Sequence, residues 1–224
     1  ATAAFPEIRY FKSIKTPVVD EEVLKAEESL VWHKLTDGDF AELSGVGYYY
    51  AVKLYKELGV PIGMIDCYQG GSSITCWLEH GILEEMPEGK VYLDEFAEAT
   101  KGQTEEDYNK ALNEYNAMVE KHLTLANKAK QENPDITQEE LDEIAGCYPW
   151  PPPVGLKSAF RPGGLIETMM KRVAPYTVKG IIYYQGEEDA IKNYKQYEQT
   201  GVNSMYENLL VRLMEEYREL FDDK

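Results

Sequence analysis

Two short apolar segments constrain the fold of this chain more than any other feature of its sequence. Residues 60–68 read VPIGMIDCY and residues 180–184 read GIIYY, and each segment runs directly into glycine and polar side chains. Short apolar runs that are rich in β-branched and aromatic residues are typical of buried strands. We therefore expect two buried strands, each ending in a polar cluster.

Helical patterns separate the expected strands. Residues 8–14 (IRYFKSI) are a third strand-like segment, and residues 74–83 are expected to include a short helix. Apolar residues at three- and four-residue steps predict further helices at residues 40–58, 164–173 and 202–220. Strands that alternate with helices predict an α/β layer fold with a mostly parallel sheet. Ligands of such sheets bind beyond the carboxyl ends of the strands, so the two polar clusters should lie on one edge.

Residues 92–145 have a different composition, rich in Glu, Lys, Asn and Ala. Their apolar residues follow a helical stripe, and a further helix should begin after Thr137, with Glu140 as its capping-box partner. We interpret this stretch as a helical insertion in one α/β domain that spans residues 1–224. The insertion is expected to pack on the core through four residues: Phe96, Leu112, Tyr115 and Val119.

The charge of the chain restricts its partners. The sequence holds 40 acidic and 23 basic residues, a net charge of -17. This charge opposes binding to nucleic acids, which needs clustered Lys and Arg, and to anionic membrane surfaces. A neutral small molecule or a neutral glycan is easier to accommodate.

The cysteines indicate neither a disulfide framework nor a metal site. Cys67, Cys76 and Cys147 are odd in number and form no CxxC pair. We expect reduced thiols in a cytoplasmic protein that uses no metal and no cofactor.

The first polar cluster follows residue 68. Gly70 and Gly71 precede Ser72 and Ser73. Adjacent glycines allow backbone N–H groups to approach a ligand, and donors aimed at a developing oxyanion assist acyl transfer. A tight turn into a helix that a serine caps would explain the same residues.

The second polar cluster follows Tyr184. The favourable effect of acidic side chains in the first turn of a helix explains Glu188 and Asp189. It explains Gln185 less well, because that residue stands at the strand end. The Gln185 amide could donate to an oxyanion, and Glu187 could orient a histidine as the acid of a catalytic triad does.

The segments VPIGMIDCYQGGSSITCWL and VKGIIYYQGEEDA together resemble the sialate O-acetylesterase family of SGNH-like carbohydrate esterases. The resemblance covers most of residues 5–220 outside the insertion. It implies an SGNH-hydrolase-like (flavodoxin-like) layered fold and removal of O-acetyl groups from sugars such as sialic acid. It also implies that Gly71 and Gln185 contribute to an oxyanion hole and that Glu187 is the active-site carboxylate.

The resemblance also implies a serine in a G-Q-S-N motif and a histidine in a late D-x-x-H motif, and neither motif occurs here. The three histidines, His33, His80 and His122, all precede Glu187. We therefore predict an incomplete catalytic domain, completed by a missing chain segment or an oligomer partner.

Three alternatives to an incomplete esterase remain. The chain could be a non-catalytic relative of the esterases that binds glycans, or a helical interaction module built on residues 92–145. In the third alternative, His80 would activate Ser72 or Ser73 as a nucleophile inside this chain.

Overall fold

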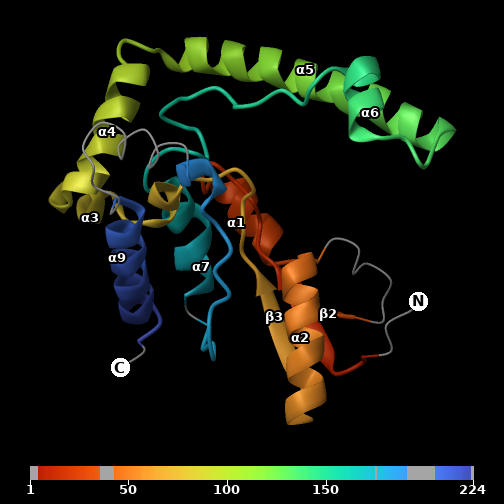
Figure 1. The fold of residues 1–224 in the computed structure, drawn as a ribbon. Coiled ribbons are helices and arrows are strands. Elements are labelled where there is room, and N and C mark those ends of the chain that lie inside the picture. Colours follow the sequence, from red (N-terminus) through yellow and green to blue (C-terminus); the bar gives the residue numbers. More distant parts are fainter. Residues whose placement is uncertain (1–4, 36–42, 175, 191–204, 223–224) are drawn as a thin grey trace. The chain divides into compact units, whose positions relative to one another are not determined.

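The computed structural model describes residues 5–35, 43–174, 176–190 and 205–222, and the chain divides into two compact units (Figure 1). The first unit comprises residues 1–94 and 159–224, and the second comprises residues 95–158. Their elements define a mixed α/β chain with a small sheet and many helices. None of the described helices combines the length and the apolar composition that crossing a bilayer requires.

The sheet of the first unit has three strands in the order β2-β1-β3. They are β1 (Ile8–Lys12), β2 (His33–Lys34) and β3 (Ile62–Asp66). β1 runs parallel to β3, with Ile8 opposite Ile62, and antiparallel to β2. The two strands predicted at residues 8–14 and 60–68 are thus confirmed as a parallel pair, with shorter bounds.

Two helices lie between these strands along the chain. They are α1 (Glu21–Glu27), between β1 and β2, and α2 (Gly45–Leu58), between β2 and β3. The Ser44 hydroxyl caps α2 by accepting from Gly47 N, and Gly59 ends the helix at a φ of 63°. A left-handed residue at this position is the usual role of glycine at a helix C-terminus. The helix predicted at 40–58 is therefore confirmed from residue 45, while residues 40–42 lie outside the described residues.

The predicted buried strand at residues 181–184 is wrong. This segment is irregular and pairs with no strand among the described residues, and Ile181 and Ile182 are 44% and 38% exposed. β3 is likewise only partly buried, rather than buried on both faces. An apolar run becomes a strand only when a neighbouring strand satisfies its backbone N–H and C=O groups, and the sequence pattern does not report that neighbour.

The larger apolar core of the first unit lies among its other helices, which confirm those predicted at residues 74–83, 164–173 and, from residue 205, at 202–220. These elements are η2 (Ile74–Trp77), α3 (His80–Glu85), the start of α4 (Pro87–Ala99), the π-helical η3 (Ile166–Met170), α7 (Lys171–Val173) and α9 (Met205–Leu220). Fully buried residues of this core include Ile74, Leu78, Leu83, Ile166 and Leu209.

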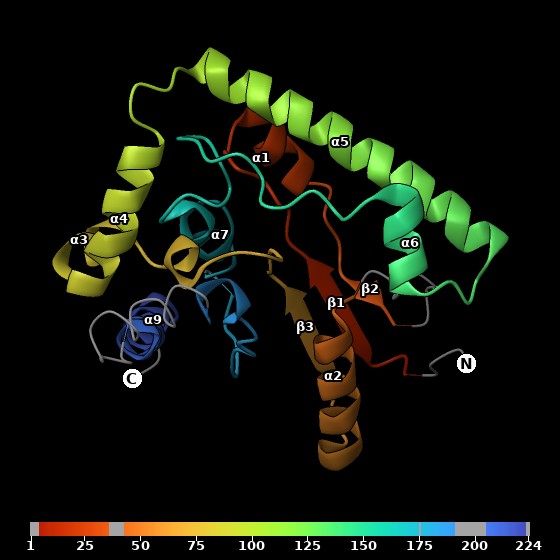
Figure 2. The same ribbon diagram turned by 45° about the horizontal axis from the view of Figure 1, so that its top comes forward.

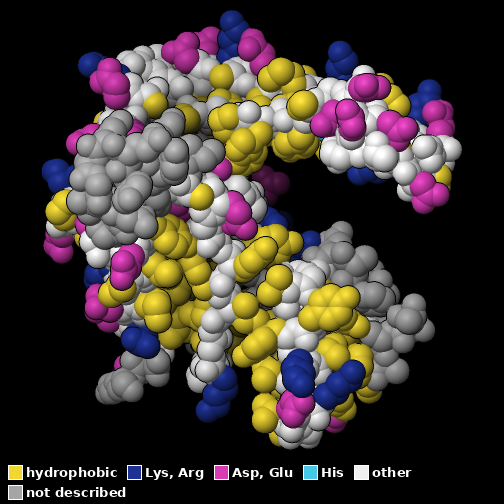
Figure 3. Space-filling view, viewed as in Figure 1, with side chains coloured by type: hydrophobic (Ala, Val, Ile, Leu, Met, Phe, Trp, Pro, Cys, Tyr) yellow, Lys and Arg dark blue, Asp and Glu magenta, His cyan; other side chains and the backbone are white. Residues whose placement is uncertain are grey.

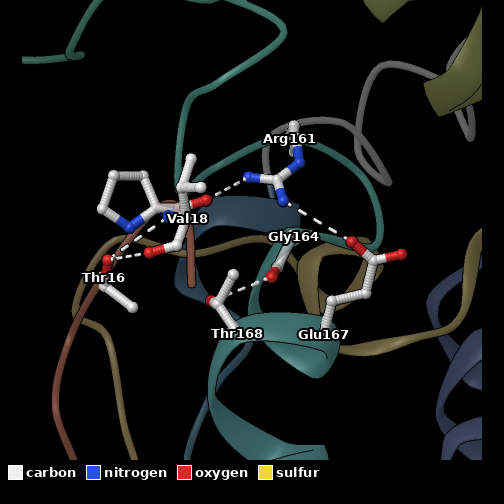
Figure 4. A network of polar contacts seen from close by, with 7 residues as sticks. Thr16, Val18, Arg161, Gly164, Glu167 and Thr168 are labelled. Carbon is white, nitrogen blue, oxygen red and sulfur yellow. Dashed lines mark hydrogen bonds and ion pairs between the residues drawn. The ribbon is translucent and has the colours of Figure 1, made fainter. Parts of the chain in front are cut away.

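Arg161 connects two distant segments of the first unit (Figure 4). Its Nη1 donates to the Pro17 carbonyl at 2.8 Å, and its Nη2 lies 3.5 Å from Glu167 Oε2. A second pair, Arg172 with Glu27, joins α7 to α1. These contacts fix the segment that follows β1 against the η3–α7 helix.

The second unit contains the end of α4, α5 (Glu105–Glu132) and α6 (Gln138–Ala145). Helices are thus confirmed in residues 92–145, and the capping box of Thr137 and Glu140 forms as predicted. Residues 146–158 are irregular and run beside α5 in both ribbon views (Figures 1 and 2). Packing of Phe96, Leu112, Tyr115 and Val119 against the first unit stays a prediction.

Candidate functional site

Asp189 is the centre of a buried polar network in the first unit. Its side chain is 1% exposed and accepts hydrogen bonds from four of the described residues. The donors are Ser73 Oγ (2.8 Å), Ile74 N (2.8 Å), Tyr92 OH (2.7 Å) and Gln185 Nε2 (2.6 Å). A carboxylate is tolerated at this depth because its oxygens are satisfied by hydrogen-bond donors. The network therefore ties the 70–75 segment, α4 and the 185–189 segment together.

Gln185 joins the two polar clusters directly. Its Nε2 donates to Ser72 O at 2.9 Å as well as to Asp189. Its Oε1 accepts from Tyr183 OH at 2.8 Å and Tyr206 OH at 3.0 Å, which fixes the orientation of the amide. Burial raises the pKa of the Tyr183 phenol, which keeps that donor protonated. The predicted meeting of the two clusters is confirmed, but both hydrogens of the amide already have acceptors.

The glycine turn reaches the surface beside this network. Gly70 and Gly71 are exposed, and Gly71 has a φ of 72°, which glycine adopts at low cost. Ser72 is buried behind the turn, where its hydroxyl donates to Gln69 O and accepts from Trp77 Nε1. The Ser73 hydroxyl accepts from Thr75 N and so caps η2. The helix-capping explanation of this turn is therefore correct, and the backbone of Gly71 remains at the surface.

Glu187 and Asp189 have opposite environments two residues apart. Residues 187–190 are helical, and Glu187 is exposed, with no hydrogen bond or ion pair to any described residue. Its charge contributes to raising the pKa of Tyr206, although burial of that phenol is the larger cause. Glu187 is thus accessible to another group, whereas Asp189 is committed to the network.

The described serines and histidines form no nucleophile–base pair. His80 Nδ1 lies 3.7 Å from Glu84 Oε1, and the His33 ring stacks on the Tyr10 ring with centroids 5.2 Å apart. His122 is buried in the second unit beside the Ala145 carbonyl. The alternative pairing of His80 with Ser72 or Ser73 is wrong, since both hydroxyls bind other groups.

The Cys67 and Cys76 thiols are poor nucleophiles. Burial raises the pKa of Cys67 to about 11 and that of Cys76 to about 12, so both stay protonated. Across the described ranges, no three His, Cys, Asp or Glu side chains come together as metal ligands would.

Sequence reasoning missed the central role of Asp189 and the contribution of Tyr92. The sequence pattern explains Asp189 by helix-terminus electrostatics and places Tyr92 at the edge of the insertion. A signal was present in the spacing, because Gln185 stands just before the short helical turn of residues 187–190 that carries Asp189.

Glu216 is a second buried carboxylate, in α9 and outside this network. It is 5% exposed and accepts from Glu79 N at 3.1 Å. Burial raises its pKa to about 7 from 4.5, so the folded chain binds an extra proton between these values. The stabilisation that comes from this extra proton is fully present below pH 4.5, and it is lost as the pH rises through 7.

Glu216→Gln should therefore remove a pH dependence of stability. We expect no large change at pH 5 and a gain of about 1–2 kcal/mol in the free energy of unfolding at pH 8, since the neutral amide relieves part of the cost of burying a charge. Urea unfolding at both pH values measures this, with the exposed Glu215→Gln as control. Identical pH profiles for parent and Glu216→Gln would contradict the expectation.

Comparisons with protein-family models and with curated proteins find no match. Among solved structures, the chain is similar to a carbohydrate acetylesterase from Xanthomonas citri, with a TM-score of 0.52 and 19% sequence identity. This chain shares the fold of the matched part of that esterase. The similarity covers 97% of this chain and 32% of the esterase, so the chain spans about a third of that protein's length.

Proposed function

We propose that this chain is part of a carbohydrate esterase that removes O-acetyl groups from sugars. The observation that carries the proposal is the network around Asp189, which holds the exposed glycine turn next to the segment that bears Glu187. The fold shared with a carbohydrate acetylesterase supports the same reaction. A full SGNH-like layered arrangement with a mostly parallel sheet is part of the proposal.

Each site residue has a distinct role in this proposal. The backbone N–H of Gly71 donates to the oxyanion that forms when the acetyl carbonyl is attacked. Gln185 acts by positioning, because its amide holds the carbonyl of Ser72 and thereby the turn. Glu187 orients the histidine that serves as general base, and its exposure leaves it accessible for that contact.

The nucleophilic serine and the histidine are supplied from outside the 224 residues in this proposal. The chain has no G-Q-S and no D-x-x-H motif, and its described serines and histidines are not paired. Attack by such a serine would form an acetyl-enzyme and release the sugar hydroxyl, and water would then release acetate. Sialic acid is the candidate sugar that the sequence resemblance supplies.

The isolated chain should not hydrolyse esters. We expect p-nitrophenyl acetate hydrolysis by residues 1–224 to equal the buffer background, and Ser72→Ala and Ser73→Ala to behave identically. Hydrogen-bond donors to an oxyanion accelerate hydrolysis only when a nucleophile attacks the ester carbonyl. Turnover that disappears in either serine variant would show a nucleophile inside the chain and refute its supply from elsewhere.

A non-catalytic glycan-binding relative is the second candidate function. The absence of a serine–histidine pair among the residues that the structure describes favours it, and exposed aromatic side chains of the second unit give it a specific location.

A further inference from the structure

The irregular segment of the second unit displays large aromatic side chains. Tyr148 and Trp150 are 48% and 47% exposed, and Met118 of α5 is 53% exposed. In Figure 3, hydrophobic side chains gather along one side of the middle of α5. We define five residues as the aromatic platform: Tyr115, Met118, His122, Tyr148 and Trp150.

The Tyr148 ring of the aromatic platform is held in place by its neighbours. Tyr115 OH donates to the Pro149 carbonyl at 3.2 Å, which fixes the backbone between the two exposed rings. The His122 ring meets Tyr148 edge to face, with centroids 5.4 Å apart and an interplanar angle of 89°. His122 is itself anchored, since its Nδ1 lies 3.3 Å from the Ala145 carbonyl. Tyr148 therefore needs little further ordering to receive a ligand.

The backbone that carries these rings is also restrained. Pro149 and Pro151–Pro153 limit the torsions around Trp150. Further along, Gln103 Nε2 donates to Val154 O at 3.0 Å, and Lys157 pairs with Glu105 at 2.6 Å. The segment is thus attached to α5 on both sides of Trp150. Such a restrained and exposed arrangement of aromatic rings is suited to binding rather than to a core.

The chemistry of the platform selects the class of ligand. Aromatic faces stack on the C–H faces of sugar rings, and the exposed phenol oxygen of Tyr148 can accept hydrogen bonds from sugar hydroxyls. Acidic residues outnumber basic ones in residues 95–158, so phosphates and acidic polysaccharides are repelled. Neutral sugar rings offer the required apolar faces and hydroxyls without such repulsion.

We propose that the aromatic platform binds neutral sugar residues of a glycan chain. The choice of a sugar, rather than another neutral planar ligand, rests on the proposed function. The platform would hold the carbohydrate through rings that need no acetyl group, so it can be tested without ester hydrolysis.

The test is isothermal titration calorimetry of the whole 224-residue chain with unacetylated linear oligosaccharides of xylose, mannose and glucose. We expect at least one of these to bind, and Trp150→Ala to weaken it about tenfold, since one aromatic contact contributes roughly 0.5–1.5 kcal/mol. Trp150→Phe should recover part of the affinity. Tyr49→Ala removes a 74% exposed ring from α2 and should bind like the parent.

Three results would contradict the binding of neutral sugars by the aromatic platform. They are no binding of any of the neutral oligosaccharides, unchanged affinity in Trp150→Ala, and equally tight binding of oligogalacturonate, which is acidic. If Trp150→Ala loses the circular dichroism of the parent, Trp150→Phe and Tyr148→Ala decide the question in its place. Failure of the platform would leave the esterase proposal intact, because no arm of the test involves an acetyl ester.

Discussion

Asp189→Ala should lower the free energy of unfolding by about 3–5 kcal/mol, because it leaves buried donors without an acceptor. The hydroxyls of Ser73 and Tyr92 can rotate toward other partners. The Ile74 N–H and the Gln185 amide are fixed in place and cannot. This loss is a large fraction of the stability of an ordinary domain, so much of the variant should be unfolded at 37 °C.

Urea unfolding followed by circular dichroism measures the effect of Asp189→Ala. The matched control is Glu188→Ala, which removes an exposed carboxylate from the preceding position and should change stability by less than about 0.5 kcal/mol. Asp189→Asn should lie between the two, because its amide offers one acceptor oxygen instead of two. Equal stability of the two alanine variants would show that the network around Asp189 does not hold the site together.

Gly89→Ala should destabilise the first unit by about 3 kcal/mol or more. Gly89 is buried in α4, and a Cβ there would lie 2.4 Å from Leu83 O and 2.6 Å from Leu83 Cα. Backbone atoms cannot move aside as the end of a flexible side chain can, so α3 and α4 would have to separate. Because Tyr92 lies on α4, the Asp189 network should loosen as well.

Gly81→Ala is the control for Gly89→Ala. Gly81 lies in α3, and a Cβ there would meet no atom within 4 Å. Alanine has the higher helix propensity, so this variant should be as stable as the parent or more stable by up to about 1 kcal/mol. Thermal unfolding of both variants provides the comparison. A Gly89→Ala midpoint equal to that of Gly81→Ala would mean that α3 and α4 do not meet at this glycine.

Periodicity and capping chemistry predicted the helices well because these signals are local. The capping box of Thr137 and Glu140 and the terminal Gly59 involve residues within one helical turn. The prediction of a strand at residues 181–184 was wrong because strand formation is not local. A strand depends on a distant partner, and the sequence of the segment carries no information about whether that partner is present.

The candidate site was predictable in part. Glycine followed by serine after a strand, and glutamine after an apolar run, indicated which segments would meet, and the hydrogen bond from Gln185 to Ser72 confirms it. The different environments of the two carboxylates, Glu187 and Asp189, could not be predicted. Glu187 and Asp189 have the same chemistry, and only the fold determines that Asp189 is buried among donors while Glu187 faces solvent.

Acetate release by the protein that the complete reading frame encodes tests the central proposal most directly. The substrate is an O-acetylated sugar, and the compared proteins are the parent, Glu187→Gln and, as control, Glu188→Gln. Both positions are exposed, so the folded state should be unaffected. We predict acetate release by the parent and by Glu188→Gln, and a kcat about 10³–10⁴-fold lower in Glu187→Gln, as for the loss of a triad acid. Absence of acetate release by the parent, or full activity of Glu187→Gln, would contradict the proposed site.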